Sequence, residues 1–193
     1  MKQRNQEHEI LKRIVSIGLL TALTAVFSMI KIPVASTATV TLVLPIVVIG
    51  AALYGPIVGA WLTVIPTITS FGEATLFLTY SPVGTGLTLF LKGILAGLCA
   101  GLIYKALSKK HPLGAVTCAA VVAPVVNSGV FVLGCYVFIW DELMALAEAN
   151  GVGIAVLLLG LVVVNFVIEL ILNLVLCPTI LRVIQLVSKK RVR

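Results

Sequence analysis

The sequence has few charged side chains. Asp, Glu, Lys and Arg make up 11% of its 193 residues, whereas about 25% is usual in a soluble domain. Hydrophobic residues instead make up 60% of the chain, and the mean hydropathy is +1.18. This composition excludes an ordinary soluble domain and indicates an integral membrane protein.

Metal-ligand patterns are absent from the sequence. The four cysteines are Cys99, Cys118, Cys135 and Cys177. They stand singly in apolar segments without CxxC spacing, and the two histidines, His8 and His111, lie in charged sequence far from them. We therefore expect no metal or other cofactor, and we interpret the cysteines as small core residues.

The sequence also lacks signs of catalysis and of nucleotide binding. It contains no GxxxxGK[ST] loop, no hydrophilic segment large enough to hold ATP, and no clustered Asp/His set or nucleophile and base pair. We therefore predict that it is not an enzyme and that any energy it uses comes from an ion gradient or another subunit. The net charge of +7 does not indicate nucleic acid, because the basic residues flank apolar runs, where they orient a membrane protein.

Six apolar runs predict six membrane-crossing helices within a single integral membrane domain over residues 1–193. Their ranges are about 14–30, 42–54, 56–70, 85–107, 113–139 and 152–187. The second and third are shorter than the about 20 residues that usually span a bilayer, and Tyr54-Gly55-Pro56 predicts a tight turn between them. Merging these two runs into one bent helix gives an alternative count of five.

The basic residues favour the count of six. Twelve of the 14 Lys and Arg residues lie in three clusters, before the first run, after the fourth and at the end of the chain. By the positive-inside rule all three clusters are cytoplasmic, which requires an even number of crossings. The predicted fold class is therefore an all-α membrane protein, a six-transmembrane-helix bundle with both termini cytoplasmic.

Two ionisable residues are predicted inside the membrane. Glu169 lies 13 residues before Arg182, and Lys92 lies 13 residues before Lys105. At 1.5 Å per residue both lie roughly 20 Å from the cytoplasmic boundary. An unpaired charge there costs at least about 2.5–3.5 kcal/mol, so we predict that the two side chains pair. The pair is either an interhelical clamp or part of substrate binding and conformational change.

Polar side chains predict where a ligand binds. Asn165, Glu169 and Asn173 recur at every fourth residue and form one stripe that faces the protein interior. Other polar and aromatic residues gather towards the predicted outer half, and an apolar wall with a few fixed donors and acceptors is typical of a small-molecule pocket. The predicted substrate-binding residues are Trp61, Glu73, Tyr80, Thr85, Thr88, Lys92, Asn127, Ser128, Asn165 and Glu169.

Alternatives stay open for several of these residues. The aromatic residues fit headgroup anchors equally well. Asn127 and Ser128 follow Pro124, which either opens the helix towards a cavity or makes a simple packing kink. The connection over 70–86 is long and apolar, and we expect it to fold over the bundle with Gly84 and Gly86 as hinges.

Small residues in the first and fourth runs predict close helix contacts. Gly18 and Ala22 are four residues apart, as are Thr21 and Ala25, and they form either a surface for a partner helix or an internal contact. The fourth run repeats the pattern, with internal packing as the alternative there. Its small residues are Gly93, Ala96, Gly97, Ala100 and Gly101.

Four short stretches carry a resemblance to a known family. They are Ala22-Leu-Thr-Ala-Val, Leu53-Tyr-Gly-Pro-Ile-Val-Gly-Ala60, Leu91-Lys-Gly-Ile-Leu-Ala-Gly-Leu98 and Leu102-Ile-Tyr-Lys105. With a long first helix and short second and third helices, they resemble the substrate-binding S components of energy-coupling factor (ECF) vitamin transporters over most of the chain.

The resemblance implies a binding subunit in the bacterial plasma membrane that holds a vitamin or related micronutrient near the outer face, beneath the loop after the third helix. It also implies docking through the first helix, at Gly18, Ala22 and Ala25, onto a transmembrane coupling subunit with two cytoplasmic ATPase subunits. The bound protein would then topple within the lipid to release its ligand inside.

Pantothenate is the favoured ligand among vitamins, because it is small and anionic and the outer half has few aromatic stacking platforms. Its carboxylate requires a cation, and Lys92 is the intramembrane candidate, which competes with the predicted pairing to Glu169. The alternative function is a proton-coupled secondary transporter in which Glu169 carries the proton, although no inverted repeat is apparent in the sequence.

Overall fold

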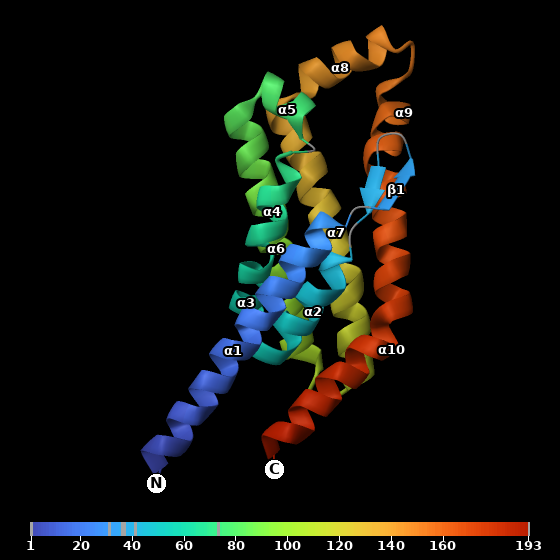
Figure 1. Ribbon diagram of the computed structural model, residues 1–193. Coiled ribbons are helices and arrows are strands. Elements are labelled where there is room, and N and C mark those ends of the chain that lie inside the picture. Colours follow the sequence, from blue (N-terminus) through green and yellow to red (C-terminus); the bar gives the residue numbers. More distant parts are fainter. Residues whose placement is uncertain (1, 31, 36–37, 41, 73, 193) are drawn as a thin grey trace.

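The computed structural model describes residues 2–30, 32–35, 38–40, 42–72 and 74–192. Most helices run along one long axis, and the start of α1 (Lys2–Met29) and the end of α10 (Val164–Val192) lie at the same pole (Figure 1). Two short helices, α5 (Thr75–Tyr80) and α8 (Trp140–Ala149), lie at the opposite pole (Figure 1). The chain is thus a helical bundle with a distinct cap at one end.

Between these elements the chain forms further helices and one hairpin. The other helices are α2 (Val43–Tyr54), α3 (Pro56–Leu62), α4 (Val64–Ser70), α6 (Pro82–Leu107), α7 (Pro112–Phe138) and α9 (Ile154–Leu158). A π-helical segment, η1 (Leu159–Val163), joins α9 to α10. Strands β1 (Ile32–Ala35) and β2 (Ala38–Val40) pair antiparallel between α1 and α2.

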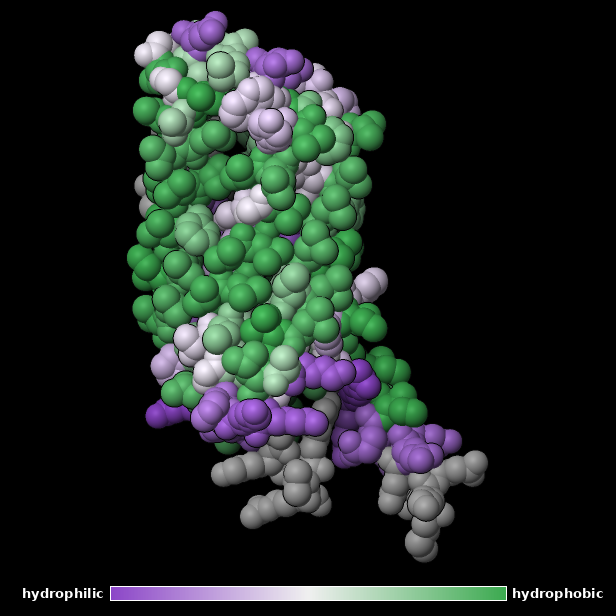
Figure 2. Space-filling model, turned by 180° about the vertical axis from the view of Figure 1, so that it is seen from behind, coloured by the Kyte–Doolittle hydropathy of each residue, from purple (hydrophilic) through white to green (hydrophobic). Residues whose placement is uncertain are grey.

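Among the described residues, four helices are long and apolar enough to cross a membrane. They cover Gln6–Met29, Pro82–Leu107, Pro112–Phe138 and Val164–Val187, and two shorter apolar helical segments cover Val43–Tyr54 and Pro56–Ser70. Figure 2 shows a broad hydrophobic body between hydrophilic ends. The protein is therefore a multi-pass membrane protein, whereas the count of six crossings and the side on which the termini lie stay predictions from the charge pattern.

The connection over 70–86 differs from the sequence expectation. Its middle forms α5, and α6 begins at Pro82, where the fixed φ of proline suits the first helical turn. Gly84 and Gly86 lie inside α6, and a Cβ added at Gly84 would come within 2.6 Å of the Phe138 side chain. The expectation of a glycine hinge here is wrong, because Gly84 is in close packing within a helix.

The small residues of α6 serve internal packing. A Cβ added at Gly97 would overlap the backbone of Gly59 in α3, and one added at Gly101 would lie 2.5 Å from Cα of Pro56. Ala96 and Ala100 are fully buried beside them. Two helix backbones therefore meet directly, which only residues without a large side chain allow.

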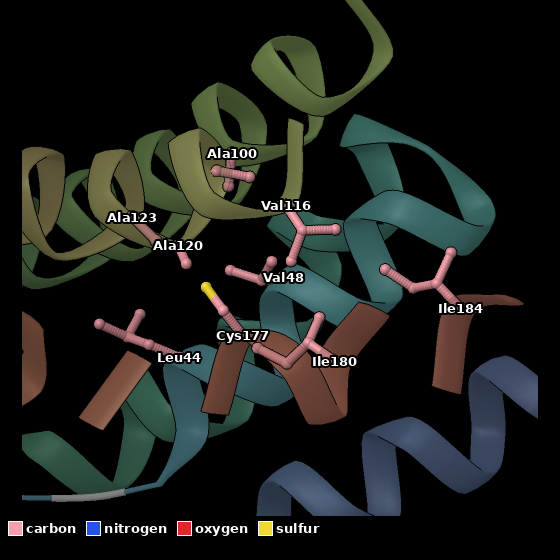
Figure 3. Packing of buried hydrophobic residues seen from close by; sticks show 10 residues of the cluster. Leu44, Val48, Ala100, Val116, Ala120, Ala123, Cys177, Ile180 and Ile184 are labelled. Atoms are coloured by element: carbon pink, nitrogen blue, oxygen red, sulfur yellow. The ribbon is translucent and has the colours of Figure 1, made fainter. Parts of the chain in front are cut away.

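A cluster of small and branched apolar residues ties α2, α6, α7 and α10 together (Figure 3). Its labelled members are Leu44, Val48, Ala100, Val116, Ala120, Ala123, Cys177, Ile180 and Ile184. Cys177 is 5% exposed and lies within this cluster. That cysteine is thus a core residue, and the cluster holds α10 against α2 and α7, the helices that flank the site described next.

Candidate functional site

A polar cavity of about 120 Å³ lies among α2, α4, α6, α7 and α10. Its lining residues are Val43, Leu44, Thr63, Pro66, Thr67, Ser70, Lys92, Gly93, Asn127, Asn165 and Glu169. The wall combines aliphatic carbon with hydroxyls, two amides, one ammonium group and one carboxyl group. In an otherwise apolar bundle, such convergence is typical of a site for a small polar molecule.

The two intramembrane ionisable residues lie in this cavity. Lys92 comes from α6 and Glu169 from α10, where the glutamate is 7% exposed. Lys92 and Glu169 line the same cavity, and Asn127 Nδ2 lies 3.5 Å from Glu169 Oε2, at the limit of a hydrogen bond. The structure thus brings together the two charges that the sequence placed at one depth, and their direct pairing stays a prediction.

The polar stripe of α10 is divided between the cavity and the protein core. Asn165 and Glu169 line the cavity, whereas Asn173 is 1% exposed and donates its Nδ2 to the Glu169 carbonyl at 2.9 Å. Within the described part of the chain, the buried Oδ1 atoms of Asn165 and Asn173 accept no hydrogen bond. Since a buried acceptor without a donor is costly, Asn165 Oδ1 at the cavity wall is suited to receive a ligand donor.

The hydroxyl side of the cavity comes from α4 and the break before it. Thr63 Oγ1 donates to the Ala60 carbonyl at 2.7 Å, and Thr67 Oγ1 donates to the Thr63 carbonyl at 2.7 Å. Opposite them, a Cβ added at Gly93 would lie 2.9 Å from Thr67 Oγ1. Gly93 therefore lets α4 approach α6 closely enough for both helices to share one cavity wall.

A second, smaller space, which we call the outer crevice, lies nearer the capped pole. Its volume is about 10 Å³, and its lining residues are Phe77, Gly84, Thr85, Thr88, Leu89, Phe131, Gly134, Cys135, Phe138 and Ile139. Phe77 comes from α5 and meets the Phe131 ring edge-on, with centroids 5.7 Å apart. The 70–86 connection thus folds onto the bundle through an aromatic contact, and α5 covers the crevice.

Phe131 lies between the two spaces. Its ring lines the outer crevice, and Lys92 Nζ, which belongs to the polar cavity, lies 5.0 Å from the ring centroid. That separation is within the range of a cation–π interaction. The side chain of Lys92 therefore contacts the Phe131 ring and also lines the polar cavity.

The predicted site residues separate into three groups. Lys92, Asn127, Asn165 and Glu169 line the polar cavity, and Thr85 and Thr88 line the outer crevice. The others lie elsewhere: Ser128 is half-buried, Trp61 is 56% exposed, Tyr80 is 45% exposed, and Glu73 lies outside the described residues. The structure thus brings together the two asparagines, the lysine and the glutamate, whereas the exposed Trp61 and Tyr80 line neither space.

Some cavity residues were not selected from the sequence. Thr63, Thr67, Ser70 and Gly93 line the polar cavity, although none was among the predicted binding residues. The sequence held one signal for the three hydroxyl residues. Positions 63, 67 and 70 are four and three residues apart, which places them on one face of a short apolar helix. Such hydroxyls usually bond to their own helix, which hides their position relative to other helices.

Helix α1 has one packed face and one open face. Thr24 and Ser28 are buried, and each donates its hydroxyl to a carbonyl of its own helix. Gly18 and Ala22 are exposed, and a Cβ added at Gly18 would meet no atom within 4 Å among the described residues. The open face is therefore free for lipid or for another helix.

Comparison with known proteins gives one match. A family model described as "ECF transporter, substrate-specific component" matches residues 12–181, which include every residue that lines the two spaces. No curated protein matches the chain. No solved structure matches it either.

Proposed function

The chain belongs to the family of ECF transporter substrate-specific components, and from that premise we propose that the polar cavity binds a vitamin or related micronutrient for an ATP-driven importer. The observation that carries the proposal is the convergence of Lys92, Asn127, Asn165 and Glu169 on one cavity inside an apolar bundle. The family is a transport family and not an enzyme family. The proposed role is therefore binding and release without chemical conversion.

Pantothenate is the ligand that we propose within this class. Its carboxylate suits the ammonium group of Lys92, and its hydroxyl and amide hydrogens suit the acceptors of Asn165 and Glu169. None of the described residues that line the polar cavity is aromatic. A cavity of that kind favours a flexible, hydrogen-bonding molecule over a flat aromatic vitamin that would stack on rings.

The proposal includes partners in the bacterial plasma membrane. A transmembrane coupling subunit would dock on the open face of α1, at Gly18, Ala22 and Ala25, and would carry two cytoplasmic ATPase subunits. The exposure of Gly18 and Ala22 and the space beside Gly18 support this face, since small residues let helices approach closely. Six crossings with both termini cytoplasmic would place the basic ends of the chain beside those ATPases.

One observation also favours a second candidate, a proton-coupled carrier. Glu169 is a buried acid with polar neighbours in a central cavity, and such groups carry protons in secondary transporters. The two functions differ in their energy source. A carrier works alone on a proton gradient, whereas the substrate-specific component requires its coupling module and ATP.

Uptake in liposomes separates the two functions. We expect the protein alone to accumulate no labelled pantothenate under an imposed pH gradient, and we expect the protein reconstituted with a coupling module to accumulate it only with ATP inside. The physical reason is that binding alone shifts no solute across the membrane without a cycle of conformational change that another component drives. Accumulation of labelled solute over time is the measurement.

An α1 variant tests the docking face in the same assay. Ala22→Trp places a bulky side chain on the exposed face, so ATP-driven uptake should fall at least about tenfold, while ligand binding by the isolated protein stays unchanged. Thr179→Trp on the exposed surface of α10 is the matched control and should leave uptake intact. Uptake without the module would support the carrier, and unimpaired uptake by Ala22→Trp would remove α1 from the docking surface.

A further inference from the structure

The polar cavity is too small for the proposed ligand. Its volume is about 120 Å³, whereas a cavity of about 150 Å³ holds benzene and sites for drug-sized ligands measure about 300–1,000 Å³. A vitamin-sized molecule therefore needs additional space. The outer crevice is the adjacent space that the structure offers.

The two spaces are stacked along the same pair of helices. On α6, Leu89 belongs to the crevice and Lys92 belongs to the cavity. On α7, Phe131 belongs to the crevice and Asn127 belongs to the cavity. Residues three or four apart lie on one helix face, so the crevice and the cavity are consecutive levels of one interhelical seam.

Phe131 is the side chain at the boundary between these levels. Its ring contacts Phe77 on the side of the outer crevice and the ammonium group of Lys92 on the side of the polar cavity. Both contacts are individually weak. A ligand anion that draws Lys92 away from the ring would remove one of them.

Resting on the proposed function, we infer that Phe131 is a movable partition and that its displacement joins cavity and crevice into one two-part binding site. The polar part, at Lys92 and Glu169, takes a carboxylate and its neighbouring hydrogen-bond donors. The other part, beneath α5, takes an aliphatic end, since half of its lining residues are phenylalanine, leucine or isoleucine. The ligand class is thus an elongated carboxylate with a branched aliphatic far end.

The hydroxyls of the crevice agree with an apolar far end. Thr88 Oγ1 already donates to the Gly84 carbonyl at 2.8 Å, so it remains available only as an acceptor. Thr85 is 7% exposed and lies one turn earlier on α6. A far end with methyl groups and at most a few hydroxyls fits such a wall, whereas a second charged group would be left without a counter-ion.

Two probes of different length test the inference. Pantothenate spans both parts, and propionate supplies only the carboxylate end. By titration calorimetry on the purified, ligand-depleted protein, we expect pantothenate to bind at least about tenfold tighter than propionate. Thr85→Leu fills the crevice and should weaken pantothenate at least about tenfold while it leaves propionate within about twofold.

Matched variants complete the test. Thr179→Leu makes the same substitution on the exposed surface of α10 and should change neither affinity. Phe131→Ala removes the partition and should accelerate pantothenate association in stopped-flow measurements more than propionate association, and this variant tests the inference even if Thr85→Leu fails to fold. Equal weakening of both probes by Thr85→Leu, or an unchanged association rate in Phe131→Ala, would overturn the two-part site.

A different result addresses the proposed function itself. If wild-type protein binds neither probe, the two-part carboxylate site is wrong. The proposed transport function then depends on whether another small molecule co-purifies with the protein, which is measured independently by mass spectrometry of the extract. Failure of the inference and failure of the function are thus read from different experiments.

Discussion

Glu169→Lys should eliminate most of the folded protein from the membrane, and the further substitution Lys92→Glu should restore it. The single variant places two basic side chains in one cavity inside the bundle, where Lys92 and Glu169 are predicted to pair. Breaking a buried ion pair costs about 3–5 kcal/mol because a charge is left uncompensated. That loss is comparable to the whole stability of many domains.

The amount of monodisperse protein in size-exclusion chromatography of a fluorescent fusion measures this effect. We expect the Lys92→Glu and Glu169→Lys single variants to fall at least about fivefold and the double variant to recover at least half of the wild-type level. Glu148→Lys, on the exposed surface of α8, is the matched control for charge reversal and should not change the level. A double variant no better than either single one would contradict the pairing.

Gly97→Leu should prevent folding almost completely. A side chain at this position would enter the backbone of Gly59, and a Cβ at Gly59 would come within 2.6 Å of the Gly97 carbonyl oxygen. Overpacking of a core usually costs about 1–3 kcal/mol. The cost here should exceed about 3 kcal/mol, because the obstructing atoms are backbone, which cannot change rotamer.

Gly129→Leu on α7 provides the control for this substitution, since a Cβ at Gly129 meets no atom within 4 Å among the described residues. It should keep near wild-type amounts of folded protein and a similar melting temperature in nanoscale fluorimetry. Gly97→Ala should show an intermediate loss, because it adds only one carbon. Normal folding of Gly97→Leu would mean that α3 and α6 do not pack backbone to backbone.

Much of the helical framework follows from the pattern of apolar residues. Uninterrupted apolar runs bounded by basic or turn residues predicted 85–107 and 113–139, and the structure has α6 (Pro82–Leu107) and α7 (Pro112–Phe138). The run predicted over 56–70 is broken between α3 and α4. The cause is present in the sequence, because Pro66 offers no N–H to the carbonyl of Leu62, where α3 ends.

Other elements depend on features that hydropathy does not report. The hairpin over 32–40 is too short for a clear alternating pattern, and β-branched residues occur in apolar helices as well as in strands. Helix α8 carries Asp141 and Glu142 in its first turn, where acids suit the positive end of a helix dipole. The sequence analysis predicted no helix between the runs over 113–139 and 152–187.

The candidate site was predicted in part. Charges and amides inside apolar runs are rare, so Lys92, Asn127, Asn165 and Glu169 were identifiable, and the structure places all four in one cavity. Aromatic residues carried less information, because Trp61 and Tyr80 are common at membrane interfaces as well as in pockets, and both are exposed. Phe131 was not selected, because nothing in a sequence shows that one phenylalanine lies over a distant lysine.

Native mass spectrometry of the purified protein tests most directly whether the polar cavity is the ligand site. The wild-type protein should carry one small molecule that is released on denaturation, and the neutral, similarly sized variants Lys92→Gln and Asn165→Leu should lose it. Thr179→Leu, outside the cavity, should retain it. A ligand held equally by all four proteins, or nanomolar binding of none of the common vitamins to the wild-type protein, would contradict this assignment.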